Sequence, residues 1–233
     1  MIIFKKNENI CEMKMKMKDK NVIIIGSGQH ANVVLYNIRC QGIYDVLGFF
    51  DSDPNKIGDK ILNLLVLESY TEANLDLLAN KYNTNKFFIG FGNMKYRKSV
   101  YELFVNSGWE AVNIFHPNAV ISQDAVIGSG VLIEAGCLIT PNPKIGDNVV
   151  INTGSQVNHD NIVEDHVYIA SGVVLSGGVT IKENTLIDDG VIVTLGKKVG
   201  KNSIIGAGSV VTKDLSNNVV AYGNPAREVR ANK

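Results

Sequence analysis

The chain has 233 residues, enough for one large domain or two modest ones. Lysine plus arginine and aspartate plus glutamate each number 23, so no global charge favours binding to nucleic acid or to an acidic membrane. The three cysteines are odd in number and widely spaced, which indicates a reduced, cytoplasmic protein and argues against a disulfide scaffold. No apolar run reaches the roughly 18 residues of a membrane span.

Residues 1–20 differ in composition from everything that follows. Methionine alternates with lysine there, the apolar core of a signal peptide is missing, and the apolar residues follow no helical stripe. We expect a disordered leader, or an upstream start codon ahead of the one at Met17.

Residues 21–26, NVIIIG, form a continuous apolar run typical of a strand buried on both faces. The turn GSGQHA at residues 26–31 follows, and then a helical pattern to Ile38. Strand, glycine turn and helix in this order present backbone N–H groups and a helix N-terminus to an anion. A second strand, VLGFF, ends at Asp51, where a carboxylate could accept a hydrogen bond from a ribose hydroxyl.

The alternation continues with a helix around residues 75–78, a strand over 87–89, a helix over 95–105 and a short strand over 110–115. It predicts a Rossmann-like α/β domain over residues 21–115. A single G-x-G-x-x-A pattern also fits a glycine turn without a ligand, and the domain is short for a full dinucleotide fold. We therefore expect a nucleotide or nucleotide-sugar site first and a nicotinamide cofactor second.

Every sixth residue from Ile121 to Val211 is aliphatic, without a break. The residue two places earlier is usually small or β-branched, and glycine or another turn residue often follows the anchor. A period of six fits neither a helix nor an ordinary strand, and it is typical of a parallel β-helix. We predict such a domain over residues 116–233, with three hexapeptides per coil, residues 18 apart stacked, and capped ends.

One histidine stands out on this β-helix. His159 lies two residues after an inward anchor, so it points outward, and Asp160 beside it could hold the imidazole as a base near neutral pH. One coil later, at +18, stands Gly177, where no side chain covers the backbone and an N–H could serve an oxyanion. The alternative is a solvated surface histidine. Against a merely solvated histidine stands Asn161, a polar residue at a position where the repeat usually has a small or β-branched one. Cys137 occupies an equivalent inward position, which indicates buried packing for its thiol.

Four segments together resemble the NeuD/PglD family of sugar acyltransferases. They are the turn at residues 26–30, the VNHD at residues 157–160, the segment 170–179 and the ending GNPA at residues 223–226. The resemblance covers roughly residues 20–230 and implies a left-handed β-helix and a homotrimer with active sites between neighbouring prisms. The unbroken repeat is consistent with a site between chains, because it leaves no long loop within one chain that could enclose a pocket.

The resemblance also implies residue roles. It makes His159 the general base, Asp160 its partner and Asn152 an asparagine near that base. Positions for acetyl-CoA, the co-substrate, are Tyr168, Gly177, Asp189 and Ala207. Positions for the sugar nucleotide are Gly28, Gln29, His30, Asp51, Gly92, Asn93 and Arg97. Tyr168 is a departure, because the family usually has a second histidine there and the nearby histidine of this chain is His166.

The resemblance implies acetyl-CoA-dependent N-acetylation of a nucleotide-linked amino sugar, and we expect a UDP-4-amino-4,6-dideoxy sugar. An O-acetyltransferase of sialic acid or a related sugar is the main alternative, and a non-catalytic trimeric scaffold is a weaker one. Metal-dependent carbonic anhydrases share the prism but need three histidines, two of them separated by five residues. His159 and His166 are seven apart, so we expect no metal site.

Overall fold

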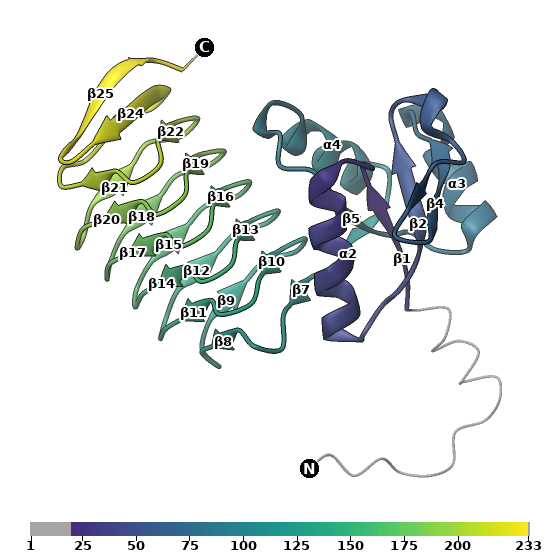
Figure 1. Ribbon diagram of the computed structural model, residues 1–233, viewed down its shortest axis with the longest axis horizontal. Coiled ribbons are helices and arrows are strands. Elements are labelled where there is room, and N and C mark those ends of the chain that lie inside the picture. Colours follow the sequence, from purple (N-terminus) through teal and green to yellow (C-terminus); the bar gives the residue numbers. More distant parts are fainter. Residues whose placement is uncertain (1–19, 233) are drawn as a thin grey trace, which may run out of the picture.

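The computed structural model describes residues 20–232, so the predicted leader lies outside the described residues except for Lys20. Two domains lie side by side: an α/β domain at the N-terminal end and a long prism of short strands (Figure 1). None of the described helices has the length and apolarity needed to span a bilayer.

The α/β domain is built on one six-stranded sheet in the order β3-β4-β2-β1-β5-β6, parallel except for β3. Its strands are β1 (Asn21–Ile25), β2 (Asp45–Asp51), β3 (Lys60–Ile61), β4 (Leu64–Ser69), β5 (Lys86–Ile89) and β6 (Glu110–Ala111). The central strand β1 is buried over Val22–Ile25, as its apolar run predicts.

Helices cover both faces of this sheet. On one face lies α2 (Gln29–Gln41), and on the other lie α3 (Leu75–Tyr82) and α4 (Met94–Asn106). Two short 3-10 helices, η1 (Pro54–Lys56) and η2 (Glu72–Asn74), complete the domain. The predicted Rossmann-like order of strands and helices is confirmed, whereas the β3–β4 hairpin and the 3-10 helices carried no periodic signal.

The second domain is a left-handed parallel β-helix of two-residue strands on three faces. The first face holds β7 (Ile114–Phe115), β10 (Leu132–Ile133), β13 (Val150–Ile151), β16 (Tyr168–Ile169), β19 (Leu186–Ile187) and β22 (Ile204–Ile205). The second holds β8 (Val120–Ile121), β11 (Leu138–Ile139), β14 (Gln156–Val157), β17 (Val174–Leu175), β20 (Ile192–Val193) and β23 (Val210–Val211). The third holds β9 (Val126–Ile127), β12 (Lys144–Ile145), β15 (Ile162–Val163), β18 (Thr180–Ile181) and β21 (Lys198–Val199).

Strand pairing confirms the predicted stacking of residues 18 apart: Ile133 pairs with Ile151 and Val157 with Leu175. From Ile133 to Val211 every aliphatic anchor is at most 3 % exposed. The anchors of the first coil, Ile121 and Ile127, are only partly buried because no coil lies beneath them.

Three-residue corners join the faces, and glycine or asparagine often takes their left-handed position. We call residues 116–118, 134–136, 152–154, 170–172, 188–190 and 206–208 the first corner, between the first and second faces. Residues 122–124, 140–142, 158–160, 176–178, 194–196 and 212–214 form the second corner, and residues 128–130, 146–148, 164–166, 182–184 and 200–202 the third.

The prediction of a single strand over residues 110–115 is wrong. Two strands replace it, because β6 completes the α/β sheet beside β5 while β7 already pairs with β10 of the β-helix. The last coil is capped by β24 (Val219–Gly223) and β25 (Ala226–Ala231), an antiparallel pair whose first strand extends the first face.

Helix α2 fastens the two domains together. It packs on the α/β sheet through Leu35 and Ile38, and the same apolar cluster continues into Leu132 and Val150 on the outside of the first face. On its other side the domain contact is polar, since Lys98 of α4 binds Glu183 of the third corner. The α/β domain is therefore held against the lower and middle coils, as Figure 1 shows.

Candidate functional site

The glycine turn opens into a cavity of about 490 Å³ at the carboxyl edge of the α/β sheet. Gly26, Ser27 and Gly28 line it together with Tyr70 and Tyr96. Helix α2 starts there with Gly28 as N-cap, without a side-chain cap and without an acidic residue in its first turn. A long helix that begins this way presents free N–H groups and a positive dipole end to an anion.

Asp51 also lines this cavity and is 6 % exposed. Its carboxylate accepts hydrogen bonds from the Ser27 N–H (3.0 Å) and hydroxyl, from the Asp53 N–H (3.1 Å) and from Lys56 Nζ (3.0 Å). Burial disfavours its charge, but these hydrogen bonds outweigh burial and lower the pKa of Asp51. Because they use most of its lone pairs, Asp51 acts mainly by shaping the glycine turn.

A second group of predicted residues meets between the domains. The rings of His30 and Tyr168 lie 6.0 Å apart, and Gly92 lies so close that a Cβ there would be 3.2 Å from the Tyr168 ring. Asn152 Nδ2 donates to the Tyr168 hydroxyl at 3.2 Å. Burial, with Arg97 nearby, lowers the pKa of His30 to about 4, so its imidazole is neutral at pH 7.

Arg97 lies behind this group and is 1 % exposed. Its Nη1 donates to the carbonyls of Ile89 and Phe91, at 3.2 and 2.9 Å, and burial lowers its pKa to about 10. The guanidinium therefore braces the loop that carries Gly92 and Asn93. Gln29 and Asn93 are exposed, and Asn93 caps α4 by accepting from Lys95 N–H.

The predicted base and its partner are paired on the second corner. His159 Nδ1 lies 2.8 Å from Asp160 Oδ2, and the side chains are 60 % and 57 % exposed. Hydrogen bonds from His159 and from Asn142 lower the pKa of Asp160. With Nδ1–H held by the carboxylate, Nε2 is the nitrogen left to accept a proton.

Gly177 lies directly against this imidazole. A Cβ on residue 177 would come within 2.3 Å of His159 Nε2, so only glycine leaves room for the ring. The expectation of an uncovered backbone is wrong, because the ring itself covers Gly177 and buries it. The Gly177 N–H nevertheless donates to no acceptor among residues 20–232.

The structure does not bring Asn152 to His159. One hexapeptide separates them along the chain, and one hexapeptide is one face of the prism, so Asn152 lies on the first corner and His159 on the second. Asp189 and Ala207 also lie on the first corner, exposed and one coil apart. On the second corner, Leu195 stacks over Gly177 and is 68 % exposed.

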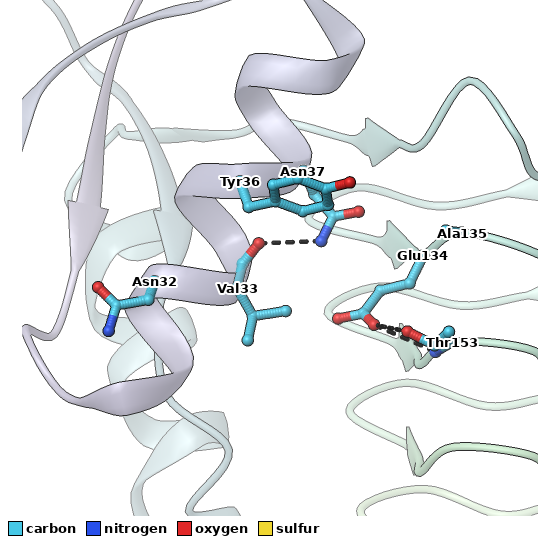
Figure 2. Close-up of a pocket in the computed structure, with 7 residues that line it drawn as sticks. All are labelled: Asn32, Val33, Tyr36, Asn37, Glu134, Ala135 and Thr153. Atoms are coloured by element: carbon cyan, nitrogen blue, oxygen red, sulfur yellow. Dashed lines mark hydrogen bonds between the residues drawn. The ribbon is translucent and has the colours of Figure 1, made fainter. Parts of the chain in front are cut away.

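A shallower groove of about 280 Å³ runs between α2 and the first corner (Figure 2). Val33 and Tyr36 line the helix side, and Glu134, Ala135 and Thr153 line the other. Glu134 is 5 % exposed, and its Oε2 accepts from both the N–H (3.1 Å) and the hydroxyl (2.5 Å) of Thr153.

Within residues 20–232, no cluster of three or more His, Cys, Asp or Glu side chains has the arrangement of a metal site. His166 is buried on the third corner, with Nδ1 3.0 Å from Asn148 Nδ2, far along the coil from His159.

Sequence reasoning missed three groups at these sites: Asn142, Lys56 and Glu134. Asn142 stands 18 residues before Asp160, so the stacking rule that located Gly177 could have found it. Lys56 reaches Asp51 from a 3-10 helix, and Glu134 faces a separate domain, and neither contact leaves a periodic trace.

Comparison with known proteins places this architecture among the hexapeptide-repeat acyltransferases. Residues 21–104 match the family model of the PglD N-terminal domain. A variant of perosamine N-acetyltransferase from Caulobacter crescentus, solved with CoA and GDP-perosamine, is 32 % identical with a TM-score of 0.83, over 90 % of this chain and 97 % of that one. The acetyltransferase domain of PglB from Neisseria gonorrhoeae, solved with acetyl coenzyme A, is 26 % identical with a TM-score of 0.80, over 90 % and 99 %. WeeI from Acinetobacter baumannii is 25 % identical with a TM-score of 0.73, over 89 % and 99 %.

Fold and site thus define an acyltransferase built on a left-handed β-helix. The chain belongs to the NeuD/PglD-like family of sugar acetyltransferases.

Proposed function

We propose that the protein transfers the acetyl group of acetyl-CoA to the amine of a nucleotide-linked amino sugar. The pairing of His159 with Asp160 against Gly177 carries this proposal, since it supplies a base of defined tautomer beside a free N–H. Support for the substrates comes from similar proteins, one solved with CoA and GDP-perosamine and another with acetyl coenzyme A. The cavity at the glycine turn suits the diphosphate of a sugar nucleotide.

In the proposed reaction the sugar amine attacks the thioester carbonyl while His159 Nε2 accepts the proton from its nitrogen. The negative charge on the carbonyl oxygen is stabilised by the Gly177 N–H. The C–S bond then breaks, and the proton passes from His159 to the departing thiolate of CoA. Asp160 holds Nδ1–H and stabilises the imidazolium during the transfer.

We propose a homotrimer as the functional unit, with the second corner of one chain facing the first corner of its neighbour. His159 is widely exposed in a single chain, whereas Asn152 lies on the first corner and its partner Tyr168 lies on the first face. Several outward side chains of the second and third faces are apolar and exposed, as expected of surfaces that pack against other copies, although Lys144, Gln156 and Lys198 share these faces. The apolar ones include Val120, Val126, Leu138, Ile162 and Ile192.

The two corners also offer a track for the long donor. Above His159 and Gly177 the second corner presents Leu195 and then Lys213, both exposed, in successive coils. Strands stack roughly 4.8 Å apart, so Gly177 and Lys213 are separated by about 10 Å along the axis. An apolar contact followed by a cation matches a pantetheine arm that ends in phosphates, with Asp189 and Ala207 at the same height on the facing corner.

Mixed trimers test the shared site. His159→Ala and Asn152→Ala each disable a different corner, so each variant alone should be inactive. Denatured together and refolded, about a quarter of the sites should combine one intact corner from each chain and regain turnover. Restored activity supports the trimeric site, whereas a mixture as inactive as its components would contradict it.

An acceptor panel tests the substrate. GDP- and UDP-linked 4-amino sugars, their free monosaccharides and free sialic acids are offered with acetyl-CoA, and thiol release is measured. We expect turnover with a nucleotide-linked amine. Turnover with free sialic acid instead would favour O-acetylation.

A further inference from the structure

Below His159, the second corner carries a column of polar residues that continues past Asp160. At the left-handed position of this corner the coils have Asn142, Asp160, Gly178 and Gly196 in order. Glycine is the unstrained choice there, and the coils above the base use it. Among these four left-handed positions, side chains occur only in the coil of His159 and in the coil beneath it.

These side chains are bonded to one another. Asn142 Nδ2 donates to Asp160 Oδ1 at 2.6 Å, while Asp160 Oδ2 accepts from His159 at 2.8 Å. The Asp160 N–H also bonds the Pro141 carbonyl at 3.2 Å. Each oxygen of the carboxylate thus has its own donor, and the carboxylate cannot turn without losing one of them.

Asn142 is itself held from below. Its backbone N–H bonds the carboxylate of Asp124, which also accepts from the Ser122 hydroxyl at 2.5 Å. The charged groups that face the imidazole along this column are therefore Asp160 directly and Asp124 two coils below it. Asn142 separates the two carboxylates with a neutral amide, so that Asp160 keeps a donor instead of a repelling charge.

We infer that Asn142 is a positioning residue for the acetyl transfer: it orients Asp160, and through Asp160 it keeps the proton of His159 on Nδ1 and leaves Nε2 free. This inference rests on the proposed role of His159 as the base. Asn142 itself lies one coil away from the reacting atoms and is not expected to touch either substrate.

Asn142→Gly tests the inference with little backbone cost, because Gly178 and Gly196 already occupy this position in other coils. Loss of a hydrogen bond to a charged group should lower kcat about 10-fold and leave KM for acetyl-CoA unchanged. Nitrogen NMR of the imidazoles, above their pKa, should show the wild-type His159 protonated on Nδ1 alone and the variant as a mixture of tautomers.

Asn184→Gly is the matched control. Asn184 has the same left-handed backbone, with φ of 53°, and donates a comparable side-chain hydrogen bond of 2.9 Å to Asn202, but on the third corner. It should leave kcat and the His159 tautomer unchanged. An equal loss in both variants would overturn the inference, because the effect would then be general to the prism.

Asn142→Asp gives a second readout. The new carboxylate stabilises the imidazolium, so the acidic limb of the kcat/KM profile should move to higher pH. An unmoved limb together with wild-type turnover in Asn142→Gly would overturn the positioning role. His159→Ala separates the two proposals: if that variant remains active, the proposed base is wrong, whereas an inactive His159→Ala beside a fully active Asn142→Gly rejects only the role of Asn142.

Discussion

The first and second corners of the β-helix have the same backbone but opposite surroundings. On the second corner His159, Asp160 and Leu195 project into solvent, and their neighbours within residues 20–232 include residues of the same corner, Asn142 and Gly177. The lower coils of the first corner and the first face next to it meet the α/β domain, where Tyr168 of β16 is packed against Gly92 and Glu134 is buried beside α2. The second corner thus carries the proposed base in an open position, whereas the first corner, which does not carry that base, is partly enclosed by the α/β domain.

This difference indicates what each corner supplies to a shared site. The exposed corner offers groups whose chemistry depends on what covers them, since water screens an ion pair such as His159–Asp160. The first corner, where it meets the α/β domain, offers oriented donors and acceptors, such as the Asn152 amide on the Tyr168 hydroxyl. Joining the two by trimerisation would exclude water and strengthen every electrostatic contact between them.

Removing the base is expected to have the largest effect. His159→Ala should lower kcat by at least about 10²-fold, the usual contribution of general base catalysis, because no second histidine lies on that corner. The melting temperature and the trimer should be nearly unchanged, since the imidazole is mostly exposed. Steady-state kinetics and calorimetry on the same sample check both. Near-wild-type turnover would remove His159 from the mechanism.

Displacing the base is expected to cost somewhat less. Gly177→Ala puts a Cβ where His159 Nε2 now lies, so the ring must swing away, and we expect kcat to fall roughly 10- to 100-fold. Stability should hold, because the group that moves is the end of an exposed side chain.

Gly178→Ala is the converse control. Its φ is 66° and the nearest atom to a new Cβ is 3.9 Å away, so the substitution strains the backbone without touching the imidazole. It should lower stability by about 1 kcal/mol and spare kcat. Equal kinetic losses in the two variants would show that the Gly177 contact is not special.

The α/β domain supplies a contrasting test, because its variants should change binding and leave the chemistry intact. Asp51→Asn removes a charge that holds Ser27 and Lys56, so the glycine turn should loosen and KM for the sugar nucleotide should rise about 10-fold. KM for acetyl-CoA should stay constant. Ala207→Trp, on the first corner, should do the reverse by blocking the donor. A weakened acetyl-CoA affinity in Asp51→Asn would reject this division of the substrates.

The sequence predicts the prism far better than the site. Each anchor such as Val157 or Leu175 has one environment, a core of identical coils, so its period alone determines its place. The same rule placed Gly177 against His159. The rule also separates Asn152 from His159, which the family resemblance alone places together. It says nothing of contacts outside the period, since Lys56 and Glu134 meet partners from other elements. Such contacts depend on how separate elements and domains pack against one another, and a local sequence pattern does not predict this packing.

The smallest expected effect concerns the donor track on the exposed corner. Leu195→Ala removes a side chain that is 68 % exposed in the single chain and gains cover only if the pantetheine arm lies on it. Burying most of a leucine contributes on the order of 1 kcal/mol, so KM for acetyl-CoA should rise about 5-fold while kcat and the sugar-nucleotide KM stay constant. Leu77→Ala on α3 is matched in chemistry and, at 70 % exposed, in solvent access, and it should change neither constant. If Leu195→Ala behaves like Leu77→Ala, the donor arm does not run up the second corner, and the facing positions Asp189 and Ala207 would have to hold it from the first corner alone.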